Sequence, residues 1–193
     1  STSDTETILQ LVAKSKKNLS INRMVDALSQ IEGAYALVAI TNNQLIGVRD
    51  PYGIRPLMLG ELEGKYILCS ETCALDIIGA RFIREVENGE VVIISDDGIE
   101  SIKPFQKLKP RPCIFEYIYF SRPDSYLGGL SIYECRKSFG KQLAIESPMD
   151  ADYVIPVPDS GVPSAIGYAE YSKIPFELGI IRNHYVGRTF IEP

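Results

Sequence analysis

The sequence VIPVPDSGVPSAIGYAE, residues 154–170, decides the fold of the second half of the chain. The apolar residues 153–157 predict a buried strand, the tetrapeptide PDSG is a turn, and residues 163–172 have the apolar spacing of a helix. A second apolar run, residues 176–181, predicts another strand. A strand, a helix and a strand without a hairpin turn indicate a βαβ unit, and hence a parallel sheet with a right-handed crossover.

The PDSG turn lies where parallel sheets bind ligands, beyond the carboxyl end of a strand. Gly161 lets the backbone approach a ligand, Ser160 offers a hydroxyl, and Asp159 offers a carboxylate for a metal ion or a ribose hydroxyl. Backbone amides at a helix N-terminus also favour an anion. The turn lacks the lysine of a P-loop and the spacing of GxGxxG. The residues alone therefore fit an anion-binding turn and a plain connector equally well.

A polar loop follows the second strand at the same edge of the expected sheet. It contains Tyr185, Gly187, Arg188 and Thr189. A guanidinium, a hydroxyl and a glycine in one loop suit a phosphate clamp or a mobile lid. The alternative is a surface loop with an ordinary arginine.

The first half of the chain has a different pattern, in which two helices precede a series of hairpins. Ser3 and Glu6 have the spacing of a capping box, and a second helix begins near Ser20. A short helix is predicted at 72–79, and strands are predicted at 35–40, 45–48, 65–69, 91–95 and 99–102. This order is typical of an α+β domain with an antiparallel sheet.

The basic, proline-rich segment KLKPRP, residues 107–112, is the best candidate for a linker. Beyond it, the pattern predicts an extended segment at 116–120 and a helix at 132–146, ahead of the βαβ unit. We therefore expect an α+β domain at residues 1–107 and an α/β domain at residues 108–193.

Composition narrows the classes of function. A net charge of −5, from 20 basic and 25 acidic residues, does not favour binding to nucleic acid or to an anionic membrane. No apolar run is long enough to span a bilayer, and the polar start STSDTETILQ is not a signal peptide. The four cysteines have no CxxC spacing, which favours reduced thiols in the cytoplasm. The single histidine, His184, leaves no His-rich metal site.

Several short stretches together resemble one enzyme family, glutamine phosphoribosylpyrophosphate amidotransferase, also called amidophosphoribosyltransferase. They occur in the order and at the spacing of the family, over essentially the whole chain. They are SDTE at 3–6, GAYA at 33–36, RDPYGIRPL at 49–57, SETCA at 70–74, REV at 84–86, EYIYFSRPDS at 116–125, PDS at 158–160 and residues 183–191.

The resemblance implies part of an N-terminal-nucleophile glutaminase domain at 1–107, followed by part of a type I phosphoribosyltransferase domain at 108–193. It implies an enzyme of de novo purine biosynthesis that uses the amide nitrogen of glutamine to convert phosphoribosylpyrophosphate to 5-phosphoribosylamine. It also implies Mg²⁺ as a cofactor, purine nucleotides as feedback inhibitors, and a cytoplasmic homo-oligomer.

The resemblance also assigns roles to particular residues. Asp4 corresponds to the aspartate that binds the α-amino group of glutamine. Ser160 would lie near the Mg²⁺ that accompanies phosphoribosylpyrophosphate. The residues that would bind phosphoribosylpyrophosphate are Asp159, Ser160, Gly161, Tyr185 and Arg188, the last two from the flexible lid.

The sequence departs from the family in several places. The family nucleophile is an N-terminal cysteine; no cysteine begins this chain, and Ser1 does not replace it because it leads into a helix cap. The acidic sugar-binding loop is also missing, so we expect an internal segment that is inactive alone, with no catalytic residue of its own. His184 stands where the family usually has arginine. Cys113 would ligate an iron–sulfur cluster only if the full-length protein carries one; a buried thiol is the preferred interpretation.

Two other functions remain compatible with the residues. A different phosphoribosyltransferase would explain the second half of the chain but leave Asp4 and residues 49–57 without a role. A non-catalytic nucleotide-binding regulatory module descended from such an enzyme is the third possibility. A full-length sequence with a cysteine directly after the initiator methionine would favour the first function over the third.

Overall fold

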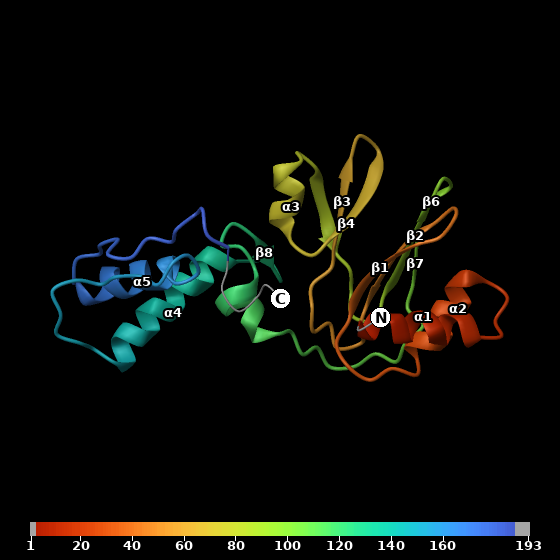
Figure 1. Cartoon of the computed structure of the whole chain (residues 1–193), viewed down its shortest axis with the longest axis horizontal. Coiled ribbons are helices and arrows are strands. Elements are labelled where there is room, and N and C mark those ends of the chain that lie inside the picture. Colours follow the sequence, from red (N-terminus) through yellow and green to blue (C-terminus); the bar gives the residue numbers. More distant parts are fainter. Residues whose placement is uncertain (1–2, 188–193) are drawn as a thin grey trace. The chain divides into compact units, whose positions relative to one another are not determined.

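The computed structural model describes residues 3–187 and divides the chain into two compact units, between Cys113 and Ile114 (Figure 1). Sequence patterns predict the division earlier, at 107–108. The difference arises because the linker does not leave the first unit at its first proline. The amides of Arg111 and Cys113 still donate hydrogen bonds to carbonyl groups of the first unit.

The first unit contains two antiparallel sheets, as expected for its α+β class. The four-stranded sheet has the order β1-β2-β6-β7, and the three-stranded sheet has the order β4-β3-β5. The bounds of the strands are β1 Ala36–Ile40, β2 Leu45–Arg49, β3 Met58–Leu62, β4 Lys65–Cys69, β5 Arg81–Glu85, β6 Val91–Ser95 and β7 Gly98–Ile102.

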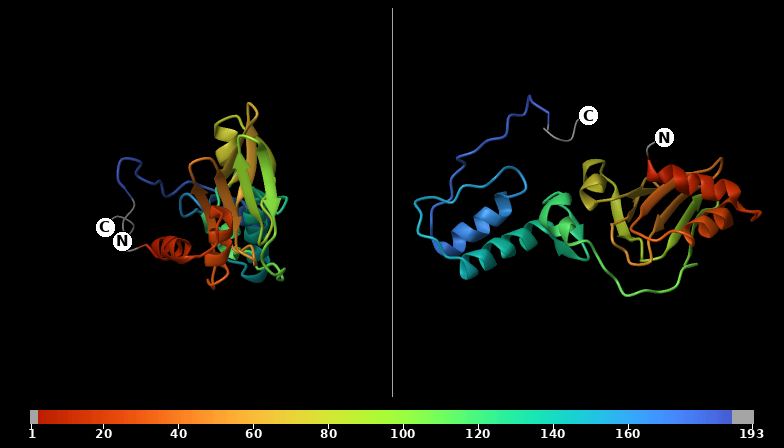
Figure 2. Two further views of the ribbon diagram at one scale, coloured as in Figure 1. Left: turned by 90° about the vertical axis from the view of Figure 1, so that its right-hand side faces the viewer. Right: turned by 60° about the horizontal axis from the view of Figure 1, so that its bottom comes forward.

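Two helices pack against the four-stranded sheet (Figure 2): α1 (Asp4–Lys14) and α2 (Ser20–Leu28). Apolar side chains at helical spacing on α2 meet alternate side chains of the strands, because residues two apart on a strand share a face. Ser3 takes the predicted cap position of α1, but its side chain makes no capping hydrogen bond. The buried cluster consists of Met24, Leu28, Tyr35, Ile46, Val48, Val91 and Ile93.

The sequence pattern did not predict β3 or β5. These two strands pair with each other, and β3 is the central strand of its sheet. The short helix α3 (Thr72–Ile77), which was predicted, connects β4 to β5. Leu75 of this helix lies over Gly60 of β3, where an added Cβ would approach a methyl carbon of Leu75 to 2.5 Å. A side chain at position 60 would therefore force the buried Leu75 side chain to move.

A buried carboxylate ties β5, β6 and β7 together. Glu90 accepts hydrogen bonds from the guanidinium of Arg84, from Ser101 Oγ and from the backbone N–H of Glu87. Burial by itself would raise the pKa of Glu90, but these donors outweigh burial, so the pKa lies below its ordinary value.

A lowered carboxyl pKa stabilises the fold above the pKa of the unfolded chain, and the stabilisation is lost as the pH falls through the folded value. We expect the free energy of unfolding of the first unit to fall as the pH drops below about 5. Glu90→Gln should cost about 1–3 kcal/mol at neutral pH and flatten this dependence. Urea unfolding at a series of pH values measures both. The control is Glu87→Gln, which breaks an exposed pair with Lys103 and should keep the wild-type pH profile.

The second unit is built around two helices, α4 (Ile132–Glu146) and α5 (Val162–Ser172), both at the predicted positions. A small hairpin, β8 (Tyr126–Leu127) and β9 (Leu130–Ser131), precedes α4. Ser131 caps α4 through its hydroxyl, which accepts from the N–H of Glu134. No helix in residues 3–187 is long and apolar enough to cross a membrane.

The prediction of an extended segment at 116–120 is wrong, because these residues form the helical turn η1 (Glu116–Phe120). The side chain of Arg136, on α4, is 1% exposed and donates hydrogen bonds to the carbonyl groups of Tyr117 and Ser121 at 2.7 Å each. A turn needs partners for the carbonyl groups that its own hydrogen bonds do not use. Arg136 supplies them from a distant part of the sequence.

The predicted βαβ unit has the expected orientation but little sheet. Val154 and Phe176, on either side of α5, form a parallel bridge. Its hydrogen bonds run from Val154 N–H to Pro175 O (2.8 Å) and from Glu177 N–H to Val154 O (3.0 Å). The predicted strands at 153–157 and 176–181 are otherwise not formed. The next donor along the first segment would be residue 156, which is a proline and has no N–H.

Glycines allow α4 and α5 to touch backbone to backbone. A Cβ on Gly140 of α4 would lie 1.8 Å from the carbonyl oxygen of Ser164, and one on Gly167 of α5 would lie 2.0 Å from the carbonyl oxygen of Lys137. The helices cross where each has only a hydrogen atom to place between them. This contact fixes α5, and with it the turn that precedes α5.

Candidate functional site

The predicted ligand-binding turn immediately precedes α5. Gly161 is the N-cap residue of this helix, and Pro163 lies in its first turn. The N–H of Gly161 donates to the carbonyl oxygen of Val157 (3.2 Å), and the N–H of Val162 donates to that of Asp159 (3.3 Å). The turn is therefore closed by its own backbone. A Cβ at residue 161 would lie 2.7 Å from Val157 O, so this tight closure requires glycine.

The closed turn limits which amides could hold an anion. The N–H groups of Gly161 and Val162 point inward, and Pro163 has none. Those of Asp159 and Ser160 are left as the candidate donors within the described turn. The positive end of the α5 dipole lies directly behind them. The geometry is thus compatible with an anion at residues 159–160.

The segment that leads into the predicted lid comes back to this turn. Arg182 Nη1 lies 3.4 Å from Asp159 Oδ2, and both side chains are substantially exposed. An exposed ion pair of this length contributes little stability. The ion pair nevertheless brings a cation and a carboxylate from two segments close together. This is expected, because both segments follow the two strands of the parallel bridge at the same edge.

Two predicted lid residues stand apart from this contact. Tyr185 is 99% exposed, and its N–H donates to Asn183 Oδ1 at 2.9 Å, which turns the chain locally. His184 is exposed beside it. Arg188, predicted to bind phosphoribosylpyrophosphate, lies outside the described residues.

Asp4, predicted to bind glutamine, lies in the first turn of α1 and is exposed. A carboxylate is favoured there by the helix dipole, whether or not it binds a ligand. Because Asp4 belongs to the first unit and residues 158–161 to the second, the structure presents two separate candidate sites.

Cys113 is half-buried, and its N–H donates to the carbonyl oxygen of Ile54 at 3.0 Å. All four cysteines are free thiols. Among residues 3–187 no three His, Cys, Asp or Glu side chains gather closely enough to hold a metal ion. Within the described part of the chain, Cys113 therefore has no partners for an iron–sulfur cluster.

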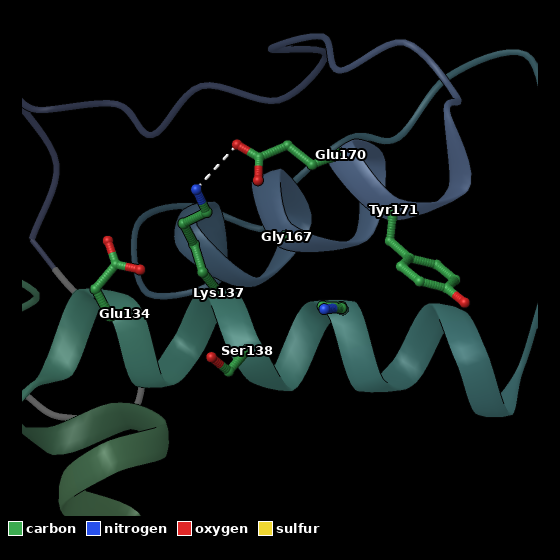
Figure 3. Close-up of a pocket in the computed structure, with 7 residues that line it drawn as sticks. Glu134, Lys137, Ser138, Gly167, Glu170 and Tyr171 are labelled. Carbon is green, nitrogen blue, oxygen red and sulfur yellow. Dashed lines mark hydrogen bonds and ion pairs between the residues drawn. The ribbon is translucent and has the colours of Figure 1, made fainter.

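Sequence patterns did not predict two grooves on the second unit. An apolar groove of about 490 Å³ adjoins the PDSG turn and is lined by side chains such as Met149, Tyr153, Ile155 and Tyr168. A polar groove of about 400 Å³ lies between α4 and α5 (Figure 3). The signal for the apolar groove in the sequence is the apolar run 153–157, which predicts a strand and equally supplies an apolar lining.

The polar groove carries balanced charges. Lys137 Nζ is 2.9 Å from Glu170 Oε1, across the two helices (Figure 3). The hydrogen bond to Glu170 raises the pKa of Lys137. Lys141 lies over the ring of Tyr171, and Glu134 adds a second carboxylate to the lining. Two lysines facing two glutamates give no net field for an anion.

Comparison with known proteins identifies the class of the first unit. Residues 1–76 match the family described as the glutamine amidotransferase domain. The matched residues include the helices α1 and α2 and the strands β1 to β4.

Over its whole length the chain is homologous to the amidophosphoribosyltransferases. It is 61% identical over 198 residues to the amidophosphoribosyltransferase of Rhizobium etli, in an alignment that covers 100% of this chain and 40% of that protein. The structure of glutamine phosphoribosylpyrophosphate amidotransferase from Bacillus subtilis, complexed with ADP and GMP, aligns with a TM-score of 0.93 at 46% identity, covering 100% of this chain and 42% of that one.

A second structure, described as the allosteric regulatory enzyme of purine biosynthesis, aligns with a TM-score of 0.92 at 46% identity, covering 98% of this chain and 41% of that chain. The family resemblance expected from the sequence is therefore confirmed. The chain spans about 40% of the length of the relatives it matches.

Proposed function

We propose that the full-length polypeptide with this sequence is an amidophosphoribosyltransferase of de novo purine biosynthesis. One unit would hydrolyse the amide of glutamine. The ammonia released would displace pyrophosphate from C1 of phosphoribosylpyrophosphate in the other unit, giving 5-phosphoribosylamine. The observation that carries this proposal is that the homology covers both units in one continuous alignment.

The proposal gives each unit a separate task. The first would be part of an N-terminal-nucleophile glutaminase, with Asp4 binding the α-amino group of glutamine. The second would be part of a type I phosphoribosyltransferase. Its turn at 158–161 would take the pyrophosphate group, and Tyr185 and Arg188 would belong to the lid. The amides of Asp159 and Ser160, which no hydrogen bond closing the turn uses, and the nearby guanidinium of Arg182 support an anionic substrate at this position.

The residues present fit Mg²⁺ as part of the substrate complex. Asp159 and Ser160 supply a carboxylate and a hydroxyl, which are ligands that Mg²⁺ accepts. Two protein oxygens are enough when phosphate groups provide others. When bound, the ion would neutralise charge on the pyrophosphate leaving group. The chain's own part would be to orient that group against the α5 N-terminus.

The residues described do not fit an iron–sulfur cluster, because Cys113 has no cysteine or histidine group around it in residues 3–187. We propose that Cys113 is a structural thiol. We also propose a cytoplasmic homo-oligomer that is inhibited by purine nucleotides, which is supported by the Bacillus subtilis relative having been solved with ADP and GMP.

The test is to assay the full-length protein with glutamine or with free ammonia as the nitrogen donor. Ser160→Ala should lower phosphoribosylamine formation with both donors by roughly tenfold, the effect of losing about one charge-assisted hydrogen bond. Glutamine hydrolysis without phosphoribosylpyrophosphate should persist. The matched control is Ser172→Ala, at the opposite end of α5. The proposed function would be contradicted if the wild-type protein failed to consume phosphoribosylpyrophosphate with either donor.

A further inference from the structure

The stretch RDPYGIRPL at 49–57 contains buried charges that the candidate sites do not use. Asp50 is fully buried and accepts hydrogen bonds from the N–H groups of Tyr52 (2.9 Å), Ile54 (3.1 Å) and Tyr35 (3.4 Å). A carboxylate that accepts several backbone donors defines the conformation of the chain around it. Asp50 thus fixes the turn that follows β2.

Arg49 holds the same turn from the other side. Its guanidinium donates to the carbonyl groups of Gly53 (3.1 Å), Arg55 (2.9 Å) and Val86 (2.8 Å), and it lies 3.5 Å from Glu85. Five rigidly spaced donors allow one arginine to hold carbonyl groups in several directions. Adjacent buried residues of opposite charge therefore bind both the N–H and the C=O groups of residues 50–55.

The turn is also closed against its neighbour. Gly53 has a φ of +62°, and an added Cβ would lie 1.8 Å from Asn88 Oδ1. Asn88 Nδ2 in turn donates to the carbonyl oxygen of Tyr52 at 3.2 Å. Neither the backbone conformation nor the space permits a side chain at residue 53.

This rigid turn holds the end of the linker. The N–H of Arg111 donates to Tyr52 O (2.9 Å), and that of Cys113 donates to Ile54 O (3.0 Å). The two segments run in the same direction with donors on alternate residues. Pro112 lies between the two donors, and Pro110 precedes the first of them. Proline is tolerated where the N–H would face away from a partner, so the alternation of the linker sequence matches this one-sided pairing.

A side-chain contact reinforces the pairing. The guanidinium carbon of Arg111 lies 5.1 Å from the centre of the Tyr52 ring. Attraction between a cation and an aromatic face is effective within about 6 Å. Tyr52 therefore contacts the linker with both its carbonyl oxygen and its ring.

We propose that residues 50–55 are a linker anchor and that Tyr52 and Arg111 are positioning residues for the coupled reaction. The linker anchor fixes the place where the chain leaves the first unit, at Cys113. Transfer of ammonia from one site to another depends on the geometry of both sites, since small displacements lower the rate of an oriented reaction steeply. This inference rests on the proposed function. Neither residue would touch a substrate.

The test compares Tyr52→Ala and Arg111→Ala with the wild type in the full-length protein. We expect unchanged glutamine KM and unchanged synthesis from free ammonia. The ratio of ammonia released to phosphoribosylamine formed should rise about two- to fivefold, the factor equivalent to one exposed cation–π contact. Tyr52→Phe and Arg111→Lys keep a ring and a cation and should restore most of the coupling. The control is Lys109→Ala, which removes an exposed cation from the same linker.

Amide hydrogen exchange distinguishes the linker anchor from the proposed function. The amides of Arg111 and Cys113 should be protected in the wild type and should exchange about two- to fivefold faster in Tyr52→Ala. Faster exchange with an unchanged ratio would overturn the proposal, and so would unprotected amides in the wild type. If the wild type makes no phosphoribosylamine from glutamine, the proposed function fails. The linker anchor would then be supported or rejected by exchange alone.

Discussion

Replacing Gly140 with alanine should destabilise the second unit by at least about 1–3 kcal/mol. The new Cβ would lie 1.8 Å from the carbonyl oxygen of Ser164, and that oxygen belongs to the backbone of α5. Rotation of a side chain cannot relieve such an overlap, so the two helices must separate. Separation also moves the turn at 158–161, because it leads directly into α5.

The prediction is decisive because the expected change in the free energy of unfolding has the opposite sign to that in an exposed helix. In an exposed helix the same substitution would stabilise by about 1 kcal/mol, because alanine has the higher helix propensity. Gly167→Ala should behave like Gly140→Ala, since its Cβ would meet Lys137 O at 2.0 Å. Ser138→Ala, at an exposed position of α4, is the control and should be nearly neutral. Urea unfolding that is monitored by hydrogen exchange of the amides of residues 132–172 reports on this unit alone. Stabilisation by Gly140→Ala would contradict the close backbone contact.

Asp4→Ala should raise the KM for glutamine in the full-length protein by roughly ten- to a hundredfold, the value of about one hydrogen bond between charged groups. The physical reason is the loss of the carboxylate proposed to bind the substrate α-amino group. Synthesis of phosphoribosylamine from free ammonia should be nearly unchanged, because it bypasses the first unit. Steady-state kinetics with the two nitrogen donors measures both.

Two controls separate binding from helix stability. Glu6→Gln removes the other carboxylate from the first turn of α1 and should leave the glutamine KM within about twofold, since an exposed charge–dipole interaction is weak. Asp4→Asn keeps the shape of the side chain without its charge and should resemble Asp4→Ala. An equal loss of activity with both donors would mean that Asp4 is structural.

Local pattern alone predicted much of this fold. The helices α4 and α5 and the hairpins β1-β2 and β6-β7 follow from apolar spacing and turn residues that lie within each segment. The family, and with it the turn at 158–161 as the place to look for a site, also follows from short stretches in order. These features depend on neighbours in the sequence, which a reader of the sequence can see.

Other features depend on partners far along the chain. The residues of β3, MLGEL, contain no β-branched side chain and give no strand signal. They form the centre of a sheet because β4 and β5 pair on both sides, and because Gly60 leaves space for Leu75. Pairing on both edges overrides weak local preference.

The turn at 116–120 and the linker at 111–113 show the same dependence. The aromatic residues of EYIYF favour a strand, but Arg136 binds the carbonyl groups that a helical turn leaves unpaired. The basic, proline-rich segment KLKPRP predicts a linker, but the rigid turn after β2 supplies acceptors for its alternate amides. Composition determined which segments could turn or extend. Only the tertiary structure decided their conformation, because buried backbone groups must find hydrogen-bond partners and those partners come from elsewhere in the chain.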